Sequence, residues 1–235
     1  MLAIEKLNQF YDESHTLWNL DLDVPKGQCT CVMGRNGVGK TTLLKAVMGE
    51  VAVKNGKLRY TTETGEIELT KKAVEERSRL GIGYVPQGRQ IFPLLTVEDN
   101  LRTGLAARSD GLKKIPERVY ELFPVLKEMK NRRGGDLSGG QQQQLAIGRA
   151  LVIEPKMLIL DEPGEGIQPN IVAQIGQVIR RLINEDGLTV LLVEQKLPFA
   201  RKYADRFVIM DRGRPVAKGE ISELSNELIK QHLTV

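Results

Sequence analysis

The stretch CTCVMGRNGVGKTTLLKAVMG, residues 29–49, decides the fold class of this chain. Its first five residues predict a strand buried on both faces, and residues 41–49 predict a helix that closes on Gly49. Between them, GRNGVGKTT fits the pattern Gly-x-x-x-x-Gly-Lys-[Ser/Thr] in the strand–loop–helix context of a phosphate loop. A merely flexible glycine turn is the weaker interpretation.

The residue types of this loop match the chemistry of nucleotide phosphates. Glycines let backbone N–H groups wrap a diphosphate, Lys40 places a cation near the β and γ oxygens, and the Thr41 hydroxyl can bind Mg²⁺. We therefore expect ATP and Mg²⁺ as cofactors. The expected nucleotide-binding residues of the loop are Gly34, Asn36, Gly37, Gly39, Lys40, Thr41 and Thr42.

A second constellation is MLILDEP, residues 157–163. A buried apolar strand that ends in two carboxylates needs a cation or a reaction to justify them. Asp161 is placed to hold the Mg²⁺ shell, and Glu162 to align and deprotonate a water that attacks the γ-phosphoryl group. The alternative, an ordinary acidic cap for the following helix, loses weight because a phosphate loop lies upstream.

The remaining pattern predicts an α/β fold with a mainly parallel sheet. Apolar strands in KMLILDEP, LTVLLVEQ and DRFVIMDRG are separated by predicted helices at 170–184 and 197–203. Residues 17–24 alternate as a half-buried antiparallel strand would, and residues 56–69 resemble a hairpin. From Thr96, which with Asp99 predicts a helix start, to about Glu154 no strand appears, so a helical insertion is expected.

Composition limits the remaining classes of protein. The 235 residues suit one large domain, their apolar runs are far shorter than the roughly 20 residues of a membrane helix, and the N-terminus lacks a secretory signal pattern. Cys29 and Cys31 are expected to be buried small hydrophobes rather than a metal or redox site. The net charge of +4 permits an anionic neighbour, but the basic pairs are scattered, so no nucleic-acid partner is expected.

A third motif is LSGGQQQQLAIGRA, residues 137–150. A serine followed by two glycines lets the backbone approach an anion closely, and free N–H groups at a helix start attract negative charge. The chain already has a phosphate loop upstream. The motif therefore raises the question of whose anion it holds.

The order of GRNGVGKTT, YVPQ, LSGGQ and LILDEP resembles the nucleotide-binding subunit of ATP-binding-cassette (ABC) transporters over essentially the full chain. The resemblance implies one ABC ATPase domain, residues 1–235, with a helical subdomain at about 94–154. It also implies that LSGGQ lies on the γ-phosphate held by a partner subunit, so that two ATP molecules are sandwiched between two chains. The glutamine run is then the first turns of the helix that follows LSGGQ.

The resemblance assigns roles to individual positions. Tyr11 looks like the aromatic that stacks on adenine, although a core tyrosine remains the alternative. Gln87 matches the glutamine that contacts Mg²⁺ and the attacking water, and Gln195 stands where a histidine usually senses the γ-phosphate. Thr41, Gln87 and Asp161 are thus the expected metal residues. The residues matching the LSGGQ motif are Ser138, Gly139, Gly140 and Gln141.

Three positions depart from the common family pattern: Gly164 replaces the usual Thr or Ser, Gln168 the usual aspartate, and Gln195 the usual histidine. The motifs as a whole resemble the branched-chain amino-acid and urea branch of bacterial uptake transporters, with details closest to the urea type. That branch implies permease subunits as partners, a second ATPase subunit in a homodimer or heterodimer, and a peripheral place on the cytoplasmic face of the inner membrane. A poorly hydrolysing regulatory subunit and a soluble ABC ATPase remain alternatives.

Overall fold

The computed structural model describes residues 1–108 and 110–233, which contain two β-sheets. The first is antiparallel and joins, in spatial order, β2 (Ser14–Val24), β1 (Leu2–Tyr11), β4 (Val53–Thr62) and β5 (Gly65–Glu68). The second joins β10 (Arg214–Glu220), β9 (Arg206–Asp211), β3 (Cys29–Met33), β8 (Thr189–Val193), β7 (Met157–Asp161) and β6 (Ile82–Val85). All its strands run parallel except β10, as the sequence predicted for its core.

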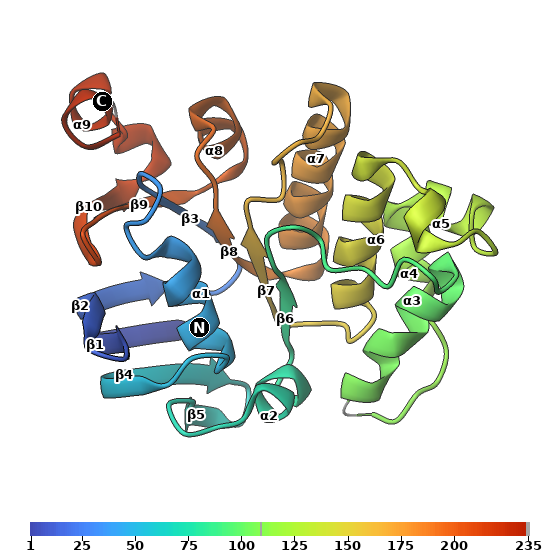
Figure 1. The fold of residues 1–235 in the computed structure, drawn as a ribbon, viewed down its shortest axis with the longest axis horizontal. Helices are drawn as coiled ribbons and strands as arrows, with labels where there is room; N and C mark the ends of the chain where they lie inside the picture. The colour runs from blue at the N-terminus through green and yellow to red at the C-terminus, as the bar shows by residue number, and fades with distance from the viewer. Residues whose placement is uncertain (109, 234–235) are drawn as a thin grey trace.

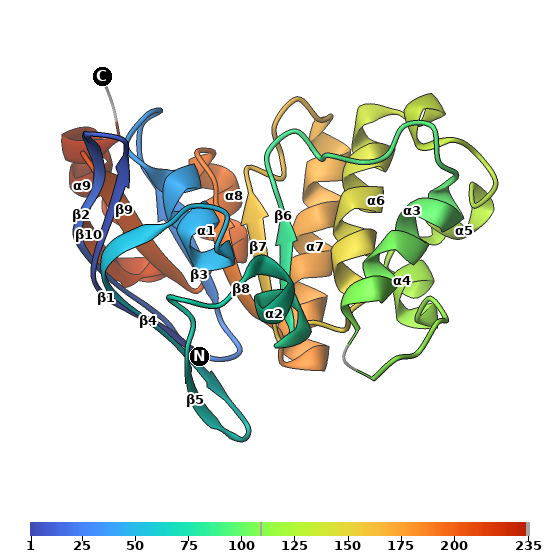
Figure 2. The ribbon, with the colours of Figure 1, turned by 60° about the horizontal axis from the view of Figure 1, so that its bottom comes forward.

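Helices cover the second sheet, and a further group of helices lies beyond one end of it. Figure 1 shows α3 to α6 grouped together, with the antiparallel sheet at the opposite end of the molecule, and Figure 2 shows the β4–β5 hairpin projecting from it. The helices are α1 (Lys40–Met48), α2 (Val74–Arg79), α3 (Val97–Gly104), α4 (Glu117–Leu122), α5 (Pro124–Glu128), α6 (Gly139–Leu151), α7 (Pro169–Asp186), α8 (Leu197–Tyr203) and α9 (Asn226–His232). Short 3-10 turns occupy Leu105–Ala107, Gly134–Asp136 and Ile221–Glu223.

The parallel sheet separates two apolar cores. Side chains of successive strand residues point to opposite faces. Leu158 and Leu160 of β7 accordingly join the core formed with α6, α7 and α8, whereas Met157 and Ile159 join the core formed with α1 and the antiparallel sheet. Burial on both faces is why these strands are continuously apolar, as predicted.

The two cysteines of β3 are fully buried, as expected, and both are free thiols. Burial raises the pKa of the Cys29 thiol to about 12, with the nearby Asp205 carboxylate acting in the same direction. Because the thiolate is the reactive form, this cysteine is chemically inert at neutral pH.

Helix α1 ends where the sequence predicted. Gly49 takes the left-handed conformation at φ 83° and caps the helix, with its N–H bonded to the Ala46 carbonyl. The buried guanidinium of Arg77, on α2, donates to the carbonyls of Ala46 and Val47 at 2.7 Å each. Arg77 thus gives the Val47 carbonyl a partner at the helix end and gives the Ala46 carbonyl a second donor, which stabilises the helix that follows the phosphate loop.

The expected helical insertion is observed. Between Thr96 and Glu154 the described residues form helices α3 to α6, and their only β-type pairing is an isolated bridge from Thr96 to Arg133. Thr96 caps α3 by accepting a hydrogen bond from the Asp99 N–H at 3.0 Å. The described residues of this stretch therefore contribute helices α3 to α6 and no strand to either sheet.

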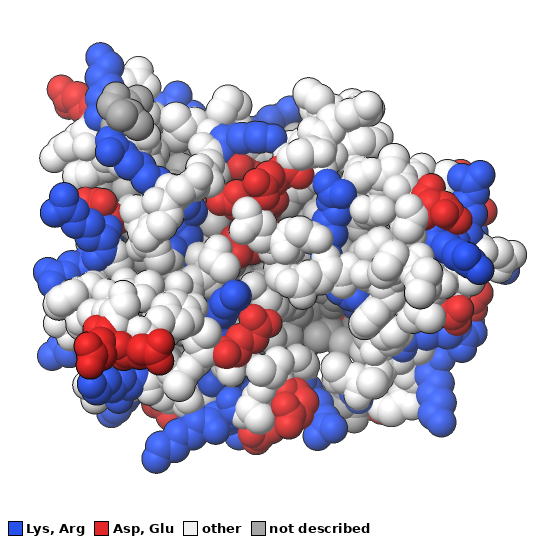
Figure 3. All heavy atoms as spheres, in the orientation of Figure 1, with Lys and Arg blue, Asp and Glu red and all other residues white. Residues whose placement is uncertain are grey.

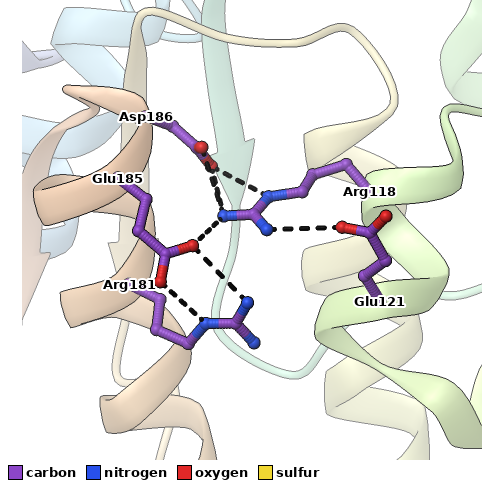
Figure 4. Close-up of polar contacts among 5 residues, drawn as sticks. All are labelled: Arg118, Glu121, Arg181, Glu185 and Asp186. Atoms are coloured by element: carbon purple, nitrogen blue, oxygen red, sulfur yellow. Dashed lines mark hydrogen bonds and ion pairs between the residues drawn. The ribbon is translucent and has the colours of Figure 1, made fainter.

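An ionic network joins this helical unit to the core (Figure 4). Arg118 of α4 donates to Glu185 at 2.6 Å and to Asp186 at 3.1 Å, both at the end of α7. On its own helix it also contacts Glu121, while Arg181 of α7 holds Glu185 from the other side. The network is partly exposed, so it orients α4 against α7 more than it stabilises the fold.

Some elements escaped the sequence analysis. Strands β1 and β10 and helices α2 and α9 were not predicted, and α7 spans Pro169–Asp186 rather than 170–184. Strand β10 alternates between exposed and half-buried residues, and α2 and α9 are only six and seven residues long. Their stability comes from packing against neighbours, which local patterns do not reveal.

Candidate active site

A cleft of about 460 Å³ lies where the loops after β3, β7 and β8 meet. Parallel strands place their carboxyl ends at one edge of the sheet, which is where ligands bind in such folds. The cleft brings together residues predicted from four separate segments of the sequence. Its lining residues are Thr16, Asn36, Gly37, Gly39, Lys40, Thr41, Thr42, Gln87, Glu162, Glu165 and Gln195.

The phosphate loop depends on glycine for its shape. Gly37 and Gly39 adopt φ values of 80° and 102°, a region that residues with side chains rarely occupy. Gly34 lies behind the loop rather than in the cleft lining, and a Cβ there would approach the Met210 carbonyl oxygen to 2.5 Å. Residues with side chains would therefore strain the loop at Gly37 and Gly39 and clash with the backbone at Gly34.

Lys40 is the buried cation of the site. Its Nζ donates to the carbonyls of Gly34 at 2.8 Å and Arg35 at 2.9 Å, which curls the loop around the side chain. Burial lowers the pKa of Lys40, while the nearby carboxylates of Glu162 and Asp161 act against that shift. The lysine is thus held at the base of the loop, where anionic oxygens would complete its coordination.

Asp161, at the end of β7, has two carboxylate oxygens with no hydrogen-bond partner among the described residues, although its side chain is almost fully buried. Burial raises its pKa, while Thr41 and then Lys40 favour the charged form. A buried carboxylate beside a hydroxyl offers the oxygen ligands that Mg²⁺ prefers. In the described part of the chain no three His, Cys, Asp or Glu side chains converge.

Glu162 and Gln195 meet directly across the cleft. Gln195 Nε2 donates to Glu162 Oε1 at 2.5 Å and to Asn36 Oδ1 at 2.8 Å, which ties the loop after β8 to both other loops. Glu162 has a left-handed backbone with φ 48°, a strained conformation of the kind found at functional sites, and its N–H donates to the Val193 carbonyl. The carboxylate is therefore fixed at the cleft as a potential general base.

Gln87 reaches the cleft from the loop after β6 and donates to Glu165 Oε2 at 2.8 Å. Sequence reasoning missed Glu165 and Thr16 as lining residues. Glu165 follows Glu162 by three residues in an acidic run, which was the only available signal, whereas Thr16 comes from β2 and had none. Figure 3 shows one group of carboxylates in the upper middle of one face, with other acidic groups, Lys and Arg distributed around it.

The LSGGQ residues and Tyr11 lie outside this cleft. Ser138 is exposed and caps α6: its N–H donates to Gln141 Oε1 at 2.9 Å, and its Oγ accepts from the Gln141 N–H at 3.4 Å. The glutamine run is helical, as expected, and Gln143 and Gln144 are buried. Tyr11, at the end of β1, is 45% exposed, so it is not part of the apolar core.

Comparison with known proteins identifies the architecture. A family model described as "ABC transporter" matches residues 17–165. The chain belongs to the ABC transporter family. It is 42% identical to the "High-affinity branched-chain amino acid transport ATP-binding protein BraG" of Pseudomonas aeruginosa, over 92% of this chain and 91% of that protein. It is 37% identical to the "Probable branched-chain amino acid transport ATP-binding protein LivF" of Archaeoglobus fulgidus, over 95% and 94%.

Solved ABC structures share the fold of this ABC protein. A nucleotide-free ATP-binding cassette from an ABC transporter superposes with a TM-score of 0.83 at 28% identity, covering 99% of this chain and 94% of that one. The ADP conformation of the cassette MJ1267 gives 0.79 at 28% identity, covering 98% and 93%. The predicted fold class and the predicted ATPase class are thereby confirmed. Within the described residues, no helix has the length and apolarity of a membrane span.

Proposed function

We propose that this chain is the ATP-hydrolysing subunit of an ABC importer, acting peripherally on the cytoplasmic face of the inner membrane with permease subunits. The observation that carries the proposal is the meeting of the phosphate loop, Glu162 and Gln195 in one cleft. The similarity to BraG and LivF, both named as transport ATP-binding proteins, supports the importer assignment. The whole chain forms one domain in this proposal, with the helical subdomain at about 94–154.

In the proposed mechanism, Lys40 and the loop N–H groups bind the phosphates of ATP. Asp161, Thr41 and Gln87 would hold Mg²⁺, which supplies neutralisation of the phosphate charge when bound. Glu162 takes the proton of the attacking water, and Gln195 orients the Glu162 carboxylate through their 2.5 Å contact. A neutral amide can orient in this way although it cannot carry the charge of the more usual histidine.

The LSGGQ motif acts on a second ATPase subunit in this proposal. Ser138 to Gln141 do not line the chain's own cleft, and the capping residue Ser138 is exposed to solvent. Both points favour a role in which these residues grip the γ-phosphate bound by a partner, in a homodimer or heterodimer. Tyr11 is proposed to stack on adenine, and its exposure leaves the ring available.

The transported solute is proposed to be a branched-chain amino acid. The names of both relatives support this choice, and neither lends specific support to the urea type that the sequence motifs suggested. In this proposal the solute passes through the permease and not through the cleft, so the cleft residues do not identify it. Urea therefore stays as the second solute to be tested.

The proposal is tested by purifying the chain with its membrane partners and reconstituting the complex in lipid vesicles with ATP inside. We expect ATP-dependent accumulation of labelled leucine on addition of the matching solute-binding protein, and none in a Glu162→Gln complex. Accumulation of urea alone would reassign the solute. Co-purification with no membrane protein, together with ATP turnover in solution, would contradict the importer role but leave the ATPase role intact.

A further inference from the structure

Residues 194–196 follow β8 and residues 162–164 follow the neighbouring strand β7, and two hydrogen bonds link the segments. Gln195 reaches Glu162 as described above. Lys196 Nζ donates to the Gly164 carbonyl at 2.8 Å. Glu194 directly precedes Gln195 in this loop, and neither the motifs nor the proposed mechanism gave it a role.

Glu194 is a buried acid, 3% exposed, beside the reacting groups. Its Oε1 accepts hydrogen bonds from the backbone N–H groups of Gln195 at 2.8 Å and Lys196 at 2.9 Å. These two contacts define the turn from which the Gln195 side chain projects. Burial raises the pKa of Glu194, while the N–H groups of Lys196 and Gln195 favour its charged form.

The other oxygen of this carboxyl, Oε2, has no hydrogen-bond partner among the described residues. It faces Gly164: a Cβ added to Gly164 would lie 3.3 Å from Glu194 Oε2. A buried acceptor without a donor is costly, and native structures contain few of them. The orphan oxygen therefore marks the place where a donor at position 164 would fit.

A serine at position 164 has room to be that donor. Gly164 does not have a left-handed backbone, so a side chain meets no conformational obstacle there. The nearest other atom to the added Cβ is Val172 Cγ1, also at 3.3 Å, which requires only a small adjustment. A hydroxyl one bond further can reach Oε2, whereas an alanine adds the same Cβ without a donor.

We propose that Glu194 is a positioning residue for ATP hydrolysis: it holds the turn that carries Gln195 and faces the loop that carries Glu162, and Gly164 leaves this second contact open. The link between the two loops is therefore incomplete in this chain, and a hydroxyl at position 164 completes it. The inference rests on ATP hydrolysis and on the proposed pairing of Gln195 with Glu162. It does not depend on the solute.

The test compares Gly164→Ser with its matched control Gly164→Ala, each with Glu194 intact and with Glu194→Ala. In the assembled transporter we expect Gly164→Ser to raise kcat for ATP roughly two- to fivefold over Gly164→Ala, with KM unchanged. The gain should vanish in the Glu194→Ala background. Glu194→Ala alone should lower kcat on the order of tenfold, and Glu194→Gln, which keeps an acceptor for the turn, should recover most of that loss.

Amide hydrogen exchange at Gln195 and Lys196 provides a readout that needs no turnover. Glu194→Ala should speed their exchange, and Gly164→Ser should slow it relative to Gly164→Ala. Equal kcat and equal exchange in the serine and alanine variants would overturn the proposal, as would a serine gain that persists without Glu194. A parent complex without ATP turnover would instead refute the ATPase role, while the exchange data would still decide whether the contact exists.

Discussion

Replacing Gln195 with alanine tests the cleft most directly, because this side chain links two of its loops. The substitution removes the 2.5 Å contact to Glu162 and the 2.8 Å contact to Asn36. A hydrogen bond to a charged group contributes about 1.5–3 kcal/mol, and a neutral one about 0.5–1.5 kcal/mol. Because Gln195 is exposed, water replaces much of the neutral contact, so the contact to the carboxylate sets the magnitude.

That contact converts to a fall in kcat of roughly 10- to 100-fold, since about 1.4 kcal/mol corresponds to tenfold in rate. The affinity for ATP should change little, because Lys40 and the loop N–H groups keep their positions. Steady-state ATP turnover and equilibrium binding of labelled ATP measure the two quantities separately. A loss in kcat without a loss in binding identifies an interaction that acts on the chemical step.

Gln195→His serves as the matched variant, since histidine is the usual residue of the family at this position. Its turnover should acquire an ionisation near about 6.5, the ordinary pKa of histidine, whereas the parent cannot have an ionisation at position 195 because an amide does not titrate. An unchanged kcat in Gln195→Ala would refute the reasoning and make the contact to Glu162 incidental. A weakened ATP affinity at full kcat would move Gln195 from the chemical step to nucleotide binding.

Further expectations concern the base, the partner site and the ionic network. Glu162→Gln should retain ATP binding, accumulate as an ATP-bound dimer and lose roughly 10²-fold or more in turnover, and turnover at the parent rate would remove Glu162 from the base role. Lys40→Ala and Ser138→Arg should each be inactive alone, yet their mixture should regain ATP hydrolysis if the chain pairs with itself. If mixed dimers are shown to form and their two sites act independently, an absence of ATP hydrolysis would count against a site shared between two chains. Arg118→Ala should lower the free energy of unfolding in urea by under about 1 kcal/mol, and 1 M NaCl should abolish the difference; a loss that survives salt would mean packing, not charge, joins α4 to α7.

The fold was predictable wherever the local sequence alone restricts the backbone conformation or the burial of a segment. The backbone of the phosphate loop favours glycine at Gly37 and Gly39, and the fully buried strands β3 and β7 are mostly apolar, so both features can be recognised from the local sequence alone. Strand β10 gives no such signal, because its half-exposed pattern becomes a strand only by pairing with β9. The position of this strand is therefore set by its pairing with β9 and not by a pattern in its own side chains.

The site shows the same division between residues that a motif identifies and residues that only the assembled fold connects. Glu162 and Lys40 were identifiable because a buried carboxylate and a lysine in a glycine loop each need a chemical reason. The contacts of Gln195 with Glu162 and Asn36 could not be identified from the sequence, because 33 and 159 residues separate the partners along the chain. Glu194 lay one residue from a predicted site, but its importance arises from an oxygen left without a donor by a glycine 30 positions earlier. Departures from a family pattern therefore gain physical meaning when the atom that the missing side chain would have contacted can be named.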